Sequence, residues 1–81
     1  MKVAVEMPKF AADAEGGRIA AWLKSEGDQV SRGDPIVEIE TDKALLEVEA
    51  MADGVLAEIV RQVDDEIPIG EVIAYIETGD D

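Results

Sequence analysis

The sequence contains no cysteine and no histidine in its 81 residues. Without cysteine, the chain can form no disulfide and has no thiol to act as a nucleophile or a zinc ligand. Without histidine, it lacks the usual general base and the commonest metal ligand of proteins. These absences argue against an enzyme active site in the chain, although carboxylates alone could still perform acid–base chemistry.

Positive charge is also scarce, with 7 Lys and Arg against 20 Asp and Glu and a net charge of −13. Such a surface repels phosphate backbones and anionic lipids, so we expect neither nucleic acid nor membrane as a partner. The charge favours solubility and encounter with basic protein surfaces. No apolar run approaches the length of a membrane span, and the N-terminus lacks the layout of a signal peptide. We therefore expect a monomeric domain of the bacterial cytoplasm.

Sustained helical periodicity is missing as well. Apolar residues alternate with polar ones in short segments that are separated by turns rich in glycine, aspartate and proline. This pattern predicts an all-β domain, and the length allows only one, over residues 1–81. We expect strands at 2–7, 18–24, 55–60 and 72–76, a segment at 36–39 that leads into a further hairpin, a surface loop at 9–17, and Trp22 in the core.

The chain repeats itself when it is shifted by 37 residues. Gly17 then falls on Gly54, Ile19 on Leu56, and Gly33 on Gly70. Matching glycines indicate equivalent turns, since such positions need a permissive backbone. Two similar halves predict a sandwich with a pseudo-twofold axis. Because Lys43 falls on Asp80, this axis places the chain termini at the end of the domain opposite the lysine.

Residues 38–49 alternate between acidic and apolar side chains on both sides of a short polar tip. This alternation predicts a β-hairpin with a two-residue turn at Asp42-Lys43, where Asp42 can hydrogen-bond its own backbone. Pairing Thr41 with Ala44 puts four apolar residues on one face (Val37, Ile39, Leu46, Val48) and four glutamates on the other (Glu38, Glu40, Glu47, Glu49). The hairpin lifts Lys43 to its apex, where a lone lysine is most often a solvated turn residue.

From about residue 3 to residue 77, the sequence resembles a lipoyl domain of the 2-oxo acid dehydrogenase complexes. The similarity rests on Met7-Pro8-Lys9, Gly17, Trp22-Leu23-Lys24, Glu26-Gly27-Asp28, Gly33-Asp34, Glu38-Ile39-Glu40-Thr41-Asp42-Lys43-Ala44, Gly54 and Pro68-Ile69-Gly70. Most of these motifs are weak individually, but Glu-Thr-Asp-Lys-Ala at a hairpin tip within a twofold repeat is specific. The resemblance implies a flattened β-barrel of two four-stranded antiparallel sheets and a non-catalytic carrier.

The resemblance further implies that Lys43 carries lipoic acid in amide linkage. A lipoate ligase or octanoyl transferase would attach the group and read the flanking Asp42 and Ala44. A thiamine-dependent decarboxylase would load an acyl group, an acyltransferase core would receive it, and a dihydrolipoyl dehydrogenase would reoxidise the dithiol. The reactive sulfurs then belong to the cofactor, which accounts for the absence of cysteine.

In the family, the first loop lies near the lysine and helps to select the decarboxylase. We therefore expect partner recognition at six loop residues and at one glutamate of the hairpin: Phe10, Ala11, Ala12, Asp13, Ala14, Glu15 and Glu40. This loop departs from the family's usual Leu, Gly, Met and Glu-Gly, and Phe10 fits a core position equally well. The later turn Val63-Asp64-Asp65 lacks the family's glycine, a form also seen in acetoin-cleaving complexes. Together with Ala21-Trp22-Leu23-Lys24, this favours an acetoin-type or related complex, while the pyruvate, 2-oxoglutarate and branched-chain complexes stay open.

Two other functions remain open. A biotin carrier shares the fold, but its lysine stands between methionines, whereas Lys43 stands between Asp42 and Ala44. An unmodified β-sandwich interaction module would use Lys43 only as a turn residue.

Overall fold

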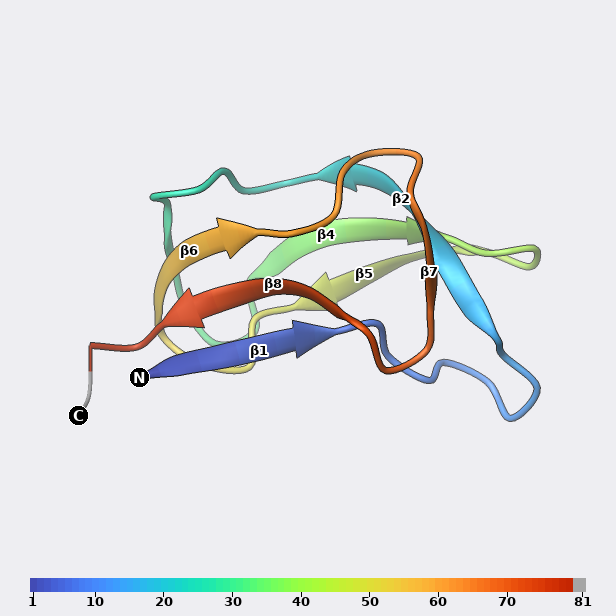
Figure 1. The fold of residues 1–81 in the computed structure, drawn as a ribbon, viewed down its shortest axis with the longest axis horizontal. Coiled ribbons are helices and arrows are strands. Elements are labelled where there is room, and N and C mark those ends of the chain that lie inside the picture. The colour runs from blue at the N-terminus through green and yellow to red at the C-terminus, as the bar shows by residue number, and fades with distance from the viewer. Residues whose placement is uncertain (80–81) are drawn as a thin grey trace.

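The computed structural model describes residues 1–79, which form eight strands and no helix. Figure 1 shows the strands in two layers that curve around a common interior. Their bounds are β1 Lys2–Glu6, β2 Gly16–Trp22, β3 Gln29–Val30, β4 Pro35–Glu40, β5 Leu45–Glu49, β6 Gly54–Ile59, β7 Glu66–Pro68 and β8 Val72–Glu77. The predicted all-β class is confirmed, and each expected strand is present within a few residues of its expected ends.

The two sheets are antiparallel, four-stranded and built alike. One has the order β1-β8-β6-β3 and the other β5-β4-β2-β7, so each strand has a counterpart at the same place in the other sheet. A register shift between Ile19 and Ala21 recurs between Leu56 and Glu58, again 37 residues later. The predicted pseudo-twofold repeat is confirmed even in its irregularities.

Aliphatic side chains from both sheets fill the core. Ile19 pairs with Ile39 across β2 and β4, Leu56 pairs with Ile76 across β6 and β8, and all four are fully buried. No polar or charged side chain is buried within residues 1–79. Trp22 packs against this core, as expected, and its indole nitrogen donates a hydrogen bond to the Arg61 carbonyl at 3.0 Å.

The start of β2 differs from the prediction, because Gly16 and Gly17 belong to the strand and not to the preceding loop. They pair with Pro68 and Ile67 of β7. A Cβ at Gly16 would collide with the Ile67 carbonyl, and one at Gly17 would lie 2.5 Å from the Ile39 side chain. Only glycine allows strands this close, so the pair that looks like a turn in sequence is a packing requirement.

The N-terminus and the β4–β5 hairpin lie at opposite ends of the long axis (Figure 1), along which the molecule measures 37 Å. The Met1 ammonium donates a hydrogen bond to Glu77 at 2.7 Å and lowers the pKa of that carboxyl. The start of the first strand therefore lies beside the end of the last strand, far from the lysine. Asp80, the predicted repeat mate of Lys43, lies outside the described residues.

Asp64 takes the backbone conformation that glycine has in the other half. Its φ is 78°, and its repeat mate Gly27 has a φ of 93°. The turns are otherwise alike: Asp28 accepts a hydrogen bond from the Ser25 amide, and Asp65 accepts one from the Gln62 amide, both at 2.8 Å. Aspartate tolerates the left-handed region better than most residues, which keeps this turn intact without glycine.

We predict that Asp64→Ala lowers the free energy of unfolding by about 1 kcal/mol, because alanine has a Cβ but no side-chain hydrogen bond to favour the left-handed backbone. Asp64→Gly should equal or exceed the wild type, since glycine adopts this conformation freely. Urea denaturation followed by circular dichroism measures both variants. Equal losses in the two would show that the aspartate is kept for its contacts and not for its backbone.

Candidate functional site

The hairpin of β4 and β5 has the predicted register. Val37 pairs with Val48 and Ile39 with Leu46. Val37 and Ile39 are fully buried, their partners are half-buried, and the glutamates lie on the other face, exposed except for the half-buried Glu38. Leu45 lies opposite Glu40, so it shares the glutamates' face, and it is 58% exposed.

The turn at the tip is held by the Thr41 hydroxyl. Its oxygen accepts hydrogen bonds from the Lys43 amide at 3.1 Å and the Ala44 amide at 3.0 Å, and the hydroxyl donates to the Ala44 carbonyl at 2.9 Å. The Thr41 amide donates to the same carbonyl. The two-residue turn is confirmed, but the prediction that Asp42 stabilises it was wrong, because Thr41 makes these side-chain bonds. Asp42 and Ala44 are both exposed beside the lysine.

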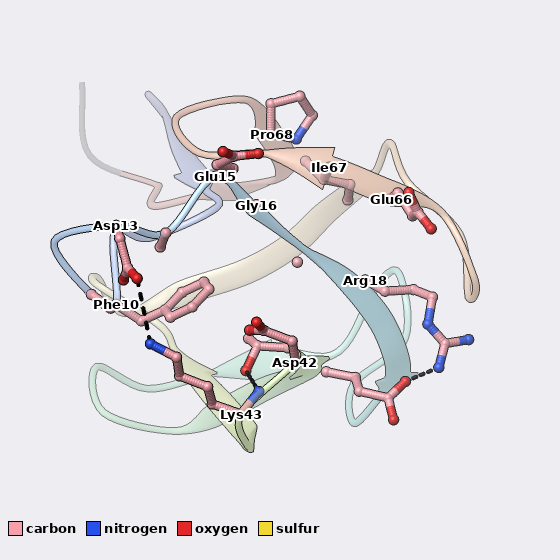
Figure 2. A pocket seen from close by; sticks show the side chains of 15 residues that line it. Phe10, Asp13, Glu15, Gly16, Arg18, Asp42, Lys43, Glu66, Ile67 and Pro68 are labelled. Carbon is pink, nitrogen blue, oxygen red and sulfur yellow. Dashed lines mark hydrogen bonds and ion pairs between the residues drawn. The ribbon is translucent and has the colours of Figure 1, made fainter.

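Lys43 stands at the apex with 66% of its side chain exposed. Its ammonium lies 3.6 Å from the Asp13 carboxylate, which belongs to the loop before β2 (Figure 2). Asp13 is 78% exposed, and an ion pair this open contributes less than about 1 kcal/mol. The pair orients the amine without enclosing it, so the lysine is accessible to a modifying enzyme.

The loop between β1 and β2 lies beside the hairpin tip, as predicted. Together they border a cleft of about 820 Å³, whose floor is formed by β2 and β7. Phe10 lines this cleft, is half-buried and does not belong to the core cluster, which answers the question that the sequence left open. Figure 2 shows its ring between the loop and the lysine. Of the other five loop residues that we expected to recognise a partner, all but Ala12 also line the cleft.

The length of this loop exceeds what the fold requires. Nine residues join β1 to β2, whereas only four join β5 to β6 at the matching place of the other half. The ends of both connections are held alike: Met7 exchanges backbone hydrogen bonds with Gly70 and Glu71, and Ala50 exchanges them with Gly33 and Asp34. The additional residues therefore bulge out at the lysine end alone.

Arg18 is the site residue that sequence reasoning missed. It lies on β2 opposite Glu40, forms an ion pair with that carboxylate, and donates a hydrogen bond to Asp64 at 2.9 Å. Glu40, which we expected to be a free docking charge, is thus engaged within the domain. The repeat carried a signal, because the residue 37 positions after Arg18 is the hydrophobic Val55. A charged residue whose repeat mate is apolar indicates a role that only one of the two halves has.

Within residues 1–79, no group of three or more acidic, histidine or cysteine side chains is placed to hold a metal ion. In the same part of the chain, no helix could cross a membrane. The chemistry available at this end is therefore that of an exposed primary amine beside an acidic cleft.

A sequence model of the family described as "Biotin-requiring enzyme", the biotin/lipoyl family, matches residues 3–76. The chain belongs to this family. It is 40% identical over 74 residues to the dihydrolipoyllysine-residue acetyltransferase component of the acetoin cleaving system of Pseudomonas putida. It is 42% identical over 83 residues to the acetyltransferase component of the pyruvate dehydrogenase complex of Rickettsia prowazekii. The alignments cover 91% and 100% of this chain but 20% of each relative, so the chain spans about a fifth of their length.

Solved structures agree with this membership. The lipoyl domain of the 2-oxoglutarate dehydrogenase complex from Azotobacter vinelandii is 41% identical, with a TM-score of 0.75 over 95% of this chain and 99% of that domain. The resemblance to lipoyl domains and the predicted flattened barrel are thereby confirmed. The urea carboxylase of Kluyveromyces lactis has a TM-score of 0.82 over 95% of this chain and 6% of the enzyme, at 23% identity, and shows the shared fold alone.

For this family member, we predict that Thr41→Val lowers the free energy of unfolding by about 1 kcal/mol, because it removes the hydroxyl from the turn. The amides of Lys43 and Ala44 should also exchange faster with solvent in NMR experiments. Thr41→Ser keeps the hydroxyl and is the matched control. Unchanged exchange in the valine variant would mean that strand pairing alone holds the lysine in place.

Proposed function

We propose that residues 1–81 act as one lipoyl-carrier domain, in which Lys43 bears lipoic acid in amide linkage. The observation that carries this proposal is an exposed lysine at the apex of a rigid hairpin, flanked by Asp42 and Ala44. The other three lysines lie elsewhere: Lys2 on β1, Lys9 in the loop and Lys24 just after β2. The attached group supplies a dithiol that accepts acyl groups and electrons.

The residues around Lys43 fit this role as holders and not as catalysts. Thr41 fixes the turn, the buried Val37 and Ile39 anchor the strand that leads to it, and two thirds of the lysine side chain is exposed. The chain has no histidine to accept a proton from the amine, so the ligase must supply the base. The domain itself presents and orients the lysine and carries the attached group.

The partners that we propose follow from the relatives. Curated relatives are named acetyltransferase components of pyruvate dehydrogenase complexes and of an acetoin cleaving system. By analogy, this domain would be loaded by a thiamine-dependent decarboxylase, unloaded by an acyltransferase core and reoxidised by a dihydrolipoyl dehydrogenase, in a bacterial cytoplasm. Its acidic surface supports fast encounter with basic docking faces. Tethering to the core would raise its local concentration at each partner.

We predict that a lipoate ligase adds one lipoyl group to the wild-type domain and none to Lys43→Arg. The arginine variant keeps the charge and the exposed turn, so its fold should be unchanged. Intact-mass spectrometry measures the increment. Lys9→Arg, which changes the nearest loop lysine in the same way, is the control and should be modified normally.

A biotin ligase tested in parallel should leave the wild type unmodified, because the flanks are Asp42 and Ala44 and not methionines. A lipoyl increment retained in Lys43→Arg would refute the site. Efficient biotinylation of the wild type would refute the choice of cofactor.

The loop before β2 is proposed to select the decarboxylase. We predict that deleting residues 11–14 leaves lipoylation of Lys43 largely intact but sharply slows reductive acylation by the cognate decarboxylase. The deletion removes a local turn, closed by a hydrogen bond from the Ala14 amide to the Ala11 carbonyl at 3.1 Å, and leaves five connecting residues. The other half of the fold spans the same place with four, so the variant should fold.

Both reactions can be followed on one preparation, after circular dichroism has confirmed the β fold. Acylation at the wild-type rate would assign partner choice to another surface, with the acidic face of the hairpin as the next candidate.

A further inference from the structure

The cleft beside Lys43, here called the lysine groove, has one wall formed by residues 10–15 of the loop, except Ala12, and the other by residues 41–43 of the hairpin tip. Gly16 and Gly17 of β2 and Ile67 and Pro68 of β7 lie along its floor. Its volume of about 820 Å³ lies within the range of clefts that hold small organic molecules. The groove therefore has room for a bound chain.

The lysine side chain is directed across this groove and not away from the domain. Its nitrogen reaches to 3.6 Å from Asp13 on the opposite wall, and Figure 2 shows the chain passing beside the Phe10 ring. An acyl chain joined to that nitrogen would begin at the mouth of the groove. No large movement of the lysine is needed to bring the attached chain against the loop.

The lining combines apolar side chains with acidic ones. Phe10, Ala11, Ala14 and Pro68 contribute carbon surface. The Ile67 side chain belongs to the core, so this residue borders the groove with little exposed surface. The charged lining residues are acidic except for Lys43 and Arg18: Asp13, Glu15, Glu40, Asp42 and Glu66. Carboxylates repel anions, so the groove suits a neutral apolar ligand and not a free fatty acid or a phosphate.

Phe10 is the aromatic residue in the lining of this groove. It is a half-buried aromatic residue on a loop, and it lies outside the core cluster. Apolar contact would hide the part of its ring that faces the groove, since removing such surface from water is favourable. An eight-carbon acyl chain in amide linkage is neutral, apolar and tethered at the right place.

We propose that the lysine groove is the resting site of the acyl chain carried on Lys43, and that the Phe10 ring packs against its methylene groups. This inference rests on the proposed function. Amide formation removes the ammonium charge, so the ion pair with Asp13 is lost and apolar contact becomes the main interaction between the arm and the loop. The loop and the resting arm then form one surface, and the decarboxylase contacts both at the same time.

NMR spectroscopy of the domain octanoylated on Lys43 tests the proposal. We expect nuclear Overhauser cross-peaks between the octanoyl methylene protons and both the Phe10 ring and the Ala14 methyl group. We also expect slower motion of a ¹³C-labelled octanoyl terminal methyl than in octanoylated peptide 38–49. The absence of these cross-peaks, with methyl relaxation equal to that of the peptide, would overturn the proposal.

Two variants make the test specific. Phe10→Ala should abolish the cross-peaks to Ala14 and restore peptide-like methyl motion. Leu45→Ala removes another exposed apolar side chain two residues from Lys43, but one outside the groove, and should leave both signals unchanged. Loss of the signals in both variants, or in neither, would contradict a role for Phe10.

Mass spectrometry of the starting sample separates this proposal from the proposed function. If ligases leave Lys43 unmodified, the carrier function fails, whatever the groove does. The groove is then tested by chemical octanoylation of a variant whose other lysines are arginine, with the position of the group verified by peptide mapping. If ligases modify Lys43 but the arm contacts nothing, the carrier function stands and the resting site is refuted.

Discussion

The register of β4 is the constraint on which the lysine end of this molecule depends. Val37 and Ile39 are fully buried, while Glu38 and Glu40 point to the opposite face of the strand. A slip of one residue would bury two carboxylates and expose two core side chains, so the register is strongly specified. Since β5 follows after a two-residue turn, the same burial that fixes β4 also fixes the place of Lys43.

Presentation of the lysine therefore needs little stabilisation at the tip itself. The contacts that lie there are exposed and weak individually: the Thr41 hydroxyl, the Asp13 ion pair, and Arg18 against Glu40. Weak contacts at the tip leave the Lys43 side chain exposed, which is compatible with the proposed attachment of lipoic acid. The buried side chains of β4 fix the position of the hairpin, and the exposure of the Lys43 side chain makes it accessible.

Much of this arrangement could be predicted from the sequence, because it depends on local patterns. Alternation predicts the hairpin and its pairing, and glycine repeats predict the two matching halves. Thr41 and Asp42 can both hydrogen-bond a nearby backbone group, so the sequence does not show which side chain holds the turn, and only the geometry decides between them. The contacts of Arg18 and Phe10 could not be predicted in this way, because they join segments that are distant in the sequence and meet only in the folded sheets. The strand pairing of Gly16 likewise depends on how closely β7 approaches β2, which is also a contact between distant segments.

The two halves of the fold also separate what the fold requires from what the site requires. Where they agree, as in the register shifts of β2 and β6, the residues serve packing. Where they differ, the differences collect near Lys43: the longer loop before β2, and Arg18 in place of a valine. Four residues connect β5 to β6 at the matching place of the other half, so folding alone does not explain the nine residues between β1 and β2. The additional residues bring Phe10 and Asp13 beside the lysine, which is the arrangement that the proposed carrier role calls for.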